Sequence, residues 1–321
     1  MVSSSGIDGS GVRESLGLSH QALVYRNDVD YLNTIVPFVR DGIAAGEPVA
    51  VALPGVRLAA VRRALGTSDA TAVHLVDMAE VGRNPTGIIG GLLRPFADGH
   101  TGHVRLVGEP IWSDRTSTEY LAALEHEALI NDAFDGRRAT ILCPYDATTL
   151  APSIIADAAA THPELIDEHG PHASGTYAPA GVVAGCNRPL TPPPDVPAFG
   201  FDLHTLAEAR RYATAHAECY GIARHRLEDV AVVVGELTAN SVQHGGGSGT
   251  LRVWREQDPD DGDSVVCQVD DGGRHTDPLA GRVPPPPDRL GGRGLFLVNR
   301  LSDLVRTHRG SDHTATRVWF R

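Results

Sequence analysis

The sequence contains no lysine: all 28 basic residues among its 321 residues are arginine. A Walker-type phosphate loop needs its lysine, and a eukaryotic-type protein kinase uses a strand lysine to hold the nucleotide phosphates. Schiff-base catalysis also requires a lysine amine. These three chemistries are excluded, so any ATP-dependent activity must hold the phosphates in another way.

Basic charge is scarce, with 28 basic against 40 acidic residues and a net charge of −12. Nucleic acids and anionic membranes need a concentrated cationic face, so we expect neither as a direct partner. No apolar run has the length of a membrane span, and residues 1–11 lack the pattern of a signal peptide. The four cysteines form no CxxC pair. Reduced thiols and a cytoplasmic location are therefore expected.

The chain divides into two folded parts by its pattern. From His20 to about Glu168 short apolar strands alternate with amphipathic helices, which predicts an α/β domain with a parallel sheet. From Phe201 two helices precede a run of strands, which predicts an α+β two-layer sandwich. The Pro- and Gly-rich stretch between them indicates an irregular linker, with room for a short strand at Val182–Val183. We therefore expect a disordered tail over 1–17, an α/β domain over 18–170, a linker over 171–200 and a second domain over 201–321.

One polar motif lies on the second helix of the C-terminal part, predicted over Arg226–His244. Glu236, Asn240 and His244 are spaced i, i+4 and i+8, so they share one face. An acid and a carboxamide one turn apart suit a hard cation shared with phosphates, with a base beside it. A polar stripe on a helix is more often its solvated face, so this pattern alone does not establish a site.

Two glycine-rich sites follow along the chain. Asp270 ends a predicted strand just before Gly272, where a carboxylate can accept a hydrogen bond while the backbone approaches a ligand closely. Gly292, Gly294 and Leu295 open the next predicted helix, and exposed amides at a helix start bind anions without a lysine. The stretch 274–290 between them is irregular, as a lid or a disordered loop would be. Each site alone is equally an ordinary turn or hinge.

The order of these motifs resembles the GHKL (Bergerat) ATP-binding fold shared by histidine kinases, gyrase-type ATPases and anti-sigma factor kinases. It runs E-x-x-x-N on a helix, D-x-G at a strand end, G-x-G-L at a helix start and a threonine on the last strand, over about residues 201–321. The resemblance implies ATP and Mg²⁺ as cofactors. It implies a general base at Glu236 and a Mg²⁺ ligand at Asn240. The other residues of the nucleotide site would be His244, Asp270 for the adenine amino group, Gly272, Gly292, Gly294, Leu295 and Thr316.

Two positions depart from the GHKL pattern, and the short length of the C-terminal domain indicates which GHKL family it resembles most. Arg274 stands where a second glycine is usual and Ala315 where a glycine precedes the last-strand threonine, so altered lid movement or weaker nucleotide affinity is expected. No dimerisation hairpin precedes the domain, which resembles the compact anti-sigma factor serine/threonine kinases. Such proteins bind a sigma factor and phosphorylate a small STAS-type antagonist. Two alternatives stay open: a non-catalytic binding module, and a histidine kinase using His204 or His216.

The N-terminal part resembles the MEDS sensory domain, a RecA-like α/β module without a phosphate loop. The matching features are His20–Tyr25, Gly42–Glu47, Gly108-Glu109 with Trp112, Cys143–Asp146 and His162-Pro163. Several side chains are expected at strand ends, where parallel sheets bind ligands: Asp77, Glu109, Cys143, Tyr145 and Asp146. With His20 or His162 they predict a small-molecule pocket or a metal site, against the alternative of ordinary helix caps. We expect this domain to gate the kinase; a homodimer is left open.

Overall fold

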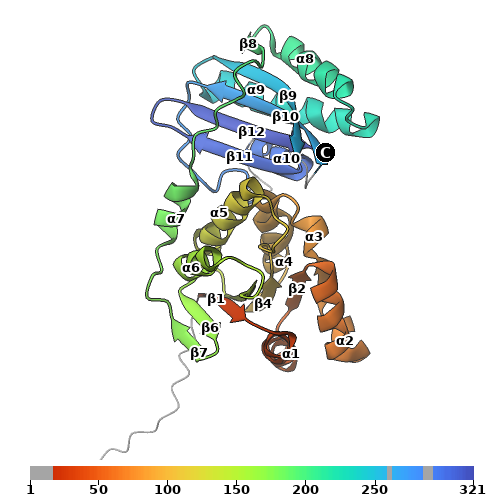
Figure 1. The fold of residues 1–321 in the computed structure, drawn as a ribbon, viewed down its shortest axis with the longest axis vertical. Helices are drawn as coiled ribbons and strands as arrows, with labels where there is room; N and C mark the ends of the chain where they lie inside the picture. The colour runs from red at the N-terminus through yellow and green to blue at the C-terminus, as the bar shows by residue number, and fades with distance from the viewer. Residues whose placement is uncertain (1–16, 259–261, 285–291) are drawn as a thin grey trace, which may run out of the picture.

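Short apolar strands build a seven-stranded sheet, sheet A, in the first part of the chain (Figure 1). The computed structural model describes residues 17–258, 262–284 and 292–321. Most of the expected tail, part of the stretch 274–290 and Gly291 lie outside these residues. Sheet A has the order β3-β2-β4-β5-β1-β6-β7, parallel except for the β6–β7 pair. Its strands are β1 (Leu18–Tyr25), β2 (Val49–Leu53), β3 (His74–Asp77), β4 (Val104–Gly108), β5 (Ala139–Asp146), β6 (Glu164–Asp167) and β7 (Gly170–Ala173).

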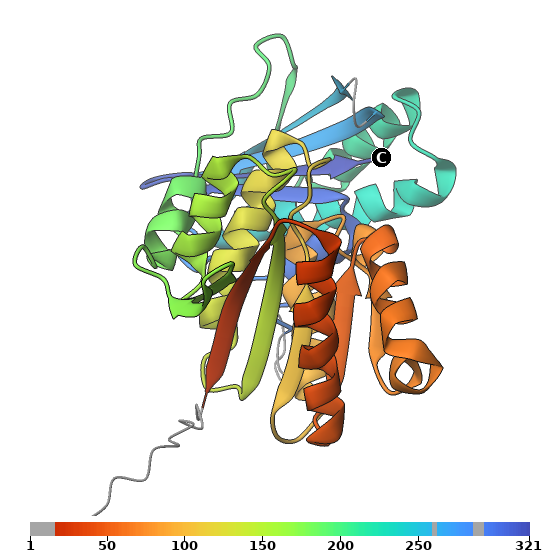
Figure 2. The same ribbon diagram turned by 60° about the horizontal axis from the view of Figure 1, so that its bottom comes forward.

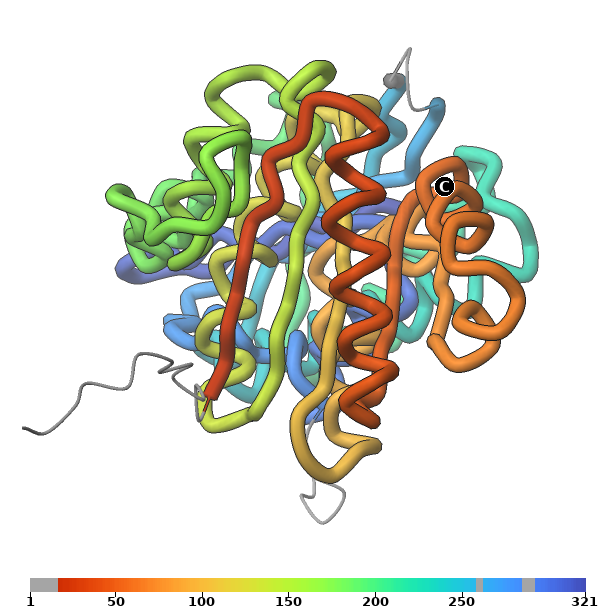
Figure 3. The backbone as a smooth tube through the Cα atoms, turned by 90° about the horizontal axis from the view of Figure 1, so that it is seen from below, coloured from red at the N-terminus to blue at the C-terminus, as the bar shows by residue number. Residues whose placement is uncertain are grey.

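Helices cover both faces of sheet A, because side chains on these strands point alternately to two apolar cores. One face is covered by α1 (Asp28–Ala44) and α2 (Gly55–Thr71), as Figure 3 shows from below. The other face carries α3 (Met78–Val81), η1 (Pro85–Gly87), η2 (Ile89–Leu93), α4 (Arg94–Asp98), α5 (Ser117–Ala133), α6 (Pro152–Thr161) and α7 (Pro179–Cys186). The expected α/β domain with a parallel sheet is confirmed.

The second domain is a five-stranded antiparallel sheet, sheet B, with helices on one face. Its strand order is β11-β12-β10-β9-β8, which confirms the α+β two-layer sandwich. The elements are β8 (Ala198–Asp202), α8 (Leu206–Cys219), η3 (Arg224–Arg226), α9 (Leu227–His244), β9 (Ser248–Asp258), β10 (Gly262–Asp271), α10 (Gly294–Leu301), β11 (Leu304–Arg309) and β12 (Thr314–Phe320). The edge strand β8 was not expected from the sequence.

The stretch 171–200 differs from the irregular linker that its composition suggested. It contains most of β7, all of α7 and the start of β8, and Val182 and Val183 lie in the helix and not in a strand. Its later part crosses the outer face of sheet B, where Gln268 donates a hydrogen bond to the Leu190 carbonyl (2.9 Å). These residues order themselves because both domains supply surface for them to pack on.

The two domains meet at α5, which lies between sheet A and sheet B (Figures 1 and 2). The outer face of sheet B presents Trp254, Val266 and Trp319, and these pack with Ala122 of α5. Every residue of α5 from Ala122 to Ile130 is buried. Within the described residues, no helix is long and apolar enough to cross a membrane.

Candidate functional site

The start of α10 lies directly against the polar face of α9. Glu236 and Asn240 are half-buried on α9, one turn apart. A Cβ atom at Gly294 would collide with the Glu236 carboxylate and lie 3.6 Å from the Asn240 amide nitrogen. A side chain at this position would have to displace the Glu236 carboxylate, so glycine lets a carboxylate, a carboxamide and the amides of a helix start share one place. Gly292 precedes them with φ +79°, a conformation that favours glycine.

Asp271, and not Asp270, faces this group from the end of β10. Ser241 of α9 donates a hydrogen bond to its Oδ2 (2.6 Å), and the Gly273 amide donates one to its Oδ1 (2.8 Å). The carboxylate of Asp270 points to the opposite face of sheet B, where Arg252 (2.9 Å) and Gln268 (2.8 Å) donate to it. The structure therefore does not bring Asp270 into the site that we predicted for it.

The glycine of this turn is Gly273, which shifts the D-x-G motif by one residue to Asp271–Gly273. A Cβ at Gly273 would lie 2.7 Å from the Gly245 Cα, so the turn packs against the end of α9 only as glycine. Gly272 is exposed, with its nearest neighbour 3.6 Å from a built Cβ. In the shifted motif His275, and not Arg274, occupies the place of the second glycine. Arg274 itself is exposed.

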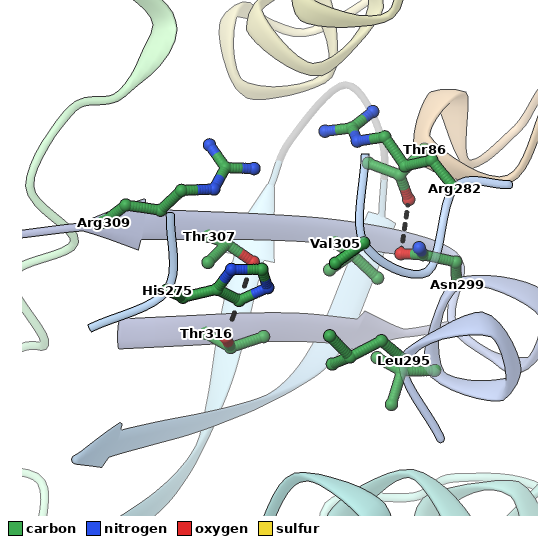
Figure 4. A pocket seen from close by; sticks show the side chains of 11 residues that line it. Thr86, His275, Arg282, Leu295, Asn299, Val305, Thr307, Arg309 and Thr316 are labelled. Carbon is green, nitrogen blue, oxygen red and sulfur yellow. Dashed lines mark hydrogen bonds between the residues drawn. The ribbon is translucent and has the colours of Figure 1, made fainter. Parts of the chain in front are cut away.

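A small pocket lies between α10 and strands β11 and β12 (Figure 4). Thr316 lines it beside Thr307, with their hydroxyl oxygens 3.4 Å apart, and Leu295 lines it from α10. His275 also lines this pocket, and burial lowers its pKa. The space that remains is about 30 Å³, enough for one or two water molecules and not for a nucleotide. The segment 275–282 supplies part of the lining of this pocket and narrows it.

The remaining predicted residues of this domain lie outside the group. His244 is exposed in the last turn of α9. His204 is exposed before α8, and His216 of α8 donates from Nδ1 to the Tyr212 carbonyl (2.8 Å) while its ring contacts the Tyr212 ring. Ala315 lies beside Thr316 on β12 with its side chain toward the other face of sheet B. That departure from the family pattern does not touch the pocket lining.

The segment 275–282 is held by the first domain through Arg282, which the sequence did not single out. Its guanidinium donates to Glu125 Oε2 of α5 (2.5 Å), and Arg309 of β11 donates to Oε1 (3.0 Å). Glu125 is 3% exposed and Arg282 is 5% exposed. Burial alone would raise the pKa of Glu125, but the charges of Arg282 and Arg309 lower it below its ordinary value. The carboxylate is thus a buried anion shared by two cations from the second domain.

Asn299 of α10 adds a second connection between the domains. Its amide nitrogen donates to the Gly281 carbonyl (2.9 Å), and its Oδ1 accepts from the Thr86 hydroxyl (2.9 Å). Asn84 donates to the Asn299 carbonyl (2.8 Å). The segment 275–282, helix α10 and the turn around η1 therefore form one hydrogen-bonded unit.

In the first domain, the residues predicted at strand ends separate into different roles. Asp77 caps α3 by accepting from the Ala79 amide (2.9 Å), and Asp146 pairs with Arg57 (3.1 Å). Glu109 is buried at the end of β4 and accepts hydrogen bonds from Tyr25 (3.3 Å) and Tyr31 (3.2 Å). Burial raises the pKa of Glu109 to about 7, against the lowering effect of these hydrogen bonds.

A second group forms between sheet A and α5. We call it the buried quartet; its members are His20 of β1, Glu127 of α5, Cys143 of β5 and His162 after α6. We expected Cys143 at a strand end. It lies inside β5 instead, because this strand continues to Asp146. Glu127 was not predicted, since nothing in a helical pattern marks one acid among several. The four ligand atoms lie within 4.8 Å of one another. Tyr145 lies beside the quartet, its ring edge-on to that of His162.

Each domain matches the model of a known family. Residues 19–163 match the model of MEDS, the MEthanogen/methylotroph, DcmR Sensory domain, and residues 199–321 match the histidine kinase-like ATPase domain. Among solved structures, the RsbU and RsbW domains of Rv1364c from Mycobacterium tuberculosis share 16% sequence identity with this chain, at a TM-score of 0.29. That match covers 39% of this chain and 32% of the other chain, so this chain spans about a third of the length of the solved structure. No curated protein matches the chain significantly.

Proposed function

Because the chain joins a MEDS sensory domain to a histidine kinase-like ATPase domain, we propose that it is an ATP-dependent regulatory kinase whose sensory domain controls access of the nucleotide. ATP is the ligand that the ATPase-like domain implies. The observation that carries the proposal is the meeting of Glu236, Asn240 and the α10 start at Gly294.

The residues present fit a nucleotide with Mg²⁺. Gly294 lets the start of α10 lie beside the Asn240 carboxamide, whose oxygen is a hard ligand of the kind Mg²⁺ prefers. When bound, Mg²⁺ neutralises the negative charge of the phosphates. The amides at the start of α10 would hold phosphate oxygens, since no lysine is available. Asp271 faces the same side as Thr316, and these two residues would receive the adenine.

Glu236 would act as the general base. Its carboxylate lies beside the α10 start, where the terminal phosphate would sit, so it can take the proton of an incoming serine or threonine hydroxyl. Most of the rate enhancement in phosphoryl transfer comes from holding the acceptor in line and balancing charge, which this arrangement provides. We infer that the acceptor is a STAS-type antagonist protein and that a sigma factor is the other partner, as the family resemblance implies.

Control by the sensory domain follows from the contacts of Glu125. The segment 275–282 lines and narrows the pocket, and Glu125 holds it there through Arg282. ATP therefore needs this segment to leave, and the ease of its departure depends on α5 of the sensory domain. A signal that shifts α5 would change the population of the open form.

The test is incubation of the full chain with labelled ATP, Mg²⁺ and a candidate STAS-type protein, beside an Asn240→Ala variant. We expect acid-stable label on the STAS-type protein, lost in the variant. Acid-labile label on this chain would instead indicate a histidine kinase.

The narrow pocket favours a second candidate, a binding module without chemistry. In that case the segment 275–282 would stay in place, and calorimetry would detect no ATP binding even at high nucleotide concentration. Binding of a sigma factor or antagonist would then be independent of ATP and unaffected by Asn240→Ala.

A further inference from the structure

We propose that the buried quartet of the sensory domain is a metal site and that Zn²⁺ is the ion its ligands fit. The quartet offers two imidazole nitrogens, one thiol sulfur and one carboxylate oxygen, which is a donor set that Zn²⁺ binds in proteins. Each of the four side chains is at most 1% exposed.

Hydrogen bonds behind the two histidines orient their rings. Nδ1 of His162 lies 2.9 Å from the Ala158 carbonyl, which can only accept, so Nδ1 carries the proton. Nδ1 of His20 faces the Oδ1 of Asn131 (3.2 Å), and the Asn131 amide nitrogen is held by the Thr161 carbonyl (2.9 Å). Both rings therefore turn an unprotonated Nε2 toward Glu127. Metal-binding histidines are commonly held in this way, with the other ring nitrogen donating to an oxygen.

Three of the distances between ligand atoms are close to those around a tetrahedral ion, and all four atoms lie within 4.8 Å of one another. Glu127 Oε2 lies 3.1 Å from His162 Nε2 and 3.5 Å from His20 Nε2, and Cys143 Sγ lies 3.5 Å from His20 Nε2. Tetrahedral Zn²⁺ with its usual bond lengths separates such ligands by about 3.3–3.6 Å.

Three polar atoms of the quartet form no hydrogen bond. Both oxygens of Glu127 and the Nε2 of His162 have no hydrogen-bond partner, although the carboxylate and this nitrogen are 3.1 Å apart. This is explained if the lone pairs of the Glu127 carboxylate and of the His162 Nε2 both point to the position of a bound ion. A hydrogen bond would instead align the two groups with each other. A buried carboxylate without a hydrogen bond is costly, and a cation bound between these ligands removes that cost.

The four ligands come from β1, α5, β5 and the chain after α6, so an ion would tie sheet A to α5. Glu125 and Glu127 are about 200° apart around this helix, which puts the quartet and the Arg282 contact on opposite sides of it. The ion would therefore set the position of the helix that holds the segment 275–282.

The test uses the full chain, stripped with a chelator and titrated with Zn²⁺ against a chromophoric competitor. One Zn²⁺ per chain is expected. Cys143→Ser and Glu127→Gln should weaken binding by at least about 100-fold, and Asn131→Ala by about 10- to 100-fold, as loss of an orienting residue does. Cys219→Ser is the matched control, because that cysteine is exposed and outside the quartet, and its affinity should equal that of the original chain.

Substitution with Co²⁺ keeps the proposal testable where a variant folds poorly. The Co²⁺ form of the original chain should show visible ligand-field bands of a tetrahedral site and a thiolate charge-transfer band in the near ultraviolet. The charge-transfer band should vanish in Cys143→Ser. Failure of the folded original chain to bind Zn²⁺ stoichiometrically would overturn the proposal, and so would a charge-transfer band that persists in Cys143→Ser. Neither outcome bears on the kinase assignment.

Discussion

Replacing Glu125 by Gln should release the segment 275–282 from the pocket that we propose for the nucleotide. In the closed form, with the segment 275–282 in the pocket, this carboxylate pairs with both Arg282 and Arg309, and all three side chains are largely buried. The variant leaves two buried guanidinium groups facing a neutral amide. When the segment leaves, Arg282 regains water, so the substitution penalises the closed form more than the open form.

The size of the effect follows from the burial of the pair. Removing one partner of a buried ion pair typically costs about 3–5 kcal/mol, and glutamine keeps one acceptor oxygen, so we expect about 2–3 kcal/mol. Each 1.4 kcal/mol is tenfold in an equilibrium constant, so the apparent affinity for ATP should rise roughly 30- to 150-fold while the closed form dominates.

The assay is calorimetric titration of ATP with Mg²⁺ into the original chain and the variant. Arg321→Gln is the control: Arg321 donates to Glu119 across the domain interface (3.0 Å), and neither residue lines the pocket. This control should leave the ATP affinity unchanged. If folded Glu125→Gln binds ATP no more tightly than the original chain, the control of nucleotide access by Arg282 and Glu125 is refuted.

Three further predictions concern single positions. Gly294→Ala should weaken ATP binding by about tenfold, because a Cβ there displaces the Glu236 carboxylate and takes up space beside the amides that would hold a phosphate. Gly181 has open space around it, so Gly181→Ala should bind ATP normally. Asp271→Asn should weaken ATP binding by about tenfold or more, whereas Asp270→Asn should leave it unchanged, and calorimetry showing the reverse would restore Asp270 as the adenine residue. Glu109→Gln should change how stability depends on pH: the raised pKa stabilises the fold below the ordinary value of 4.5, and this contribution is lost as pH rises through about 7. Between pH 5 and pH 8 the variant should therefore gain roughly 3 kcal/mol in free energy of unfolding relative to the original chain, measured by urea denaturation, and a constant difference would contradict the buried state of Glu109.

Asp270 shows why the alternation of polar and apolar residues along β10 does not tell which face of sheet B a residue lies on. In most two-layer sandwiches the outer face of the sheet is polar, so alternation shows which residues point to the helices. Here α5 covers the outer face of sheet B, and Val266 is as apolar as Val265 and Val269 on the inner face. The sequence therefore does not distinguish the two aspartates at the end of β10, and the predicted residue, Asp270, lies on the outer face.

The contacts between the domains could not be predicted for a related reason. Glu125 and Glu127 both lie in a helix with several acids, and only the packing of two domains shows that one meets Arg282 and the other meets the histidines. Local motifs such as the Glu236–Asn240 spacing are different, because both residues lie on one helix and their geometry is set by the helix itself. Most strands and helices of the two domains could be predicted from periodicity, but β7, α7 and β8 could not. The ordered motifs indicated the second domain.

Hydrogen exchange with and without ATP and Mg²⁺ tests the central claim most directly. The account predicts that nucleotide protects the amides at the start of α10 and at the end of β10, while those of residues 275–283 exchange faster because the segment has left the pocket. Asn240→Ala should abolish both changes. Protection confined to sheet A, or a segment 275–283 that becomes more protected when ATP binds, would contradict the proposed nucleotide site and its control by the sensory domain.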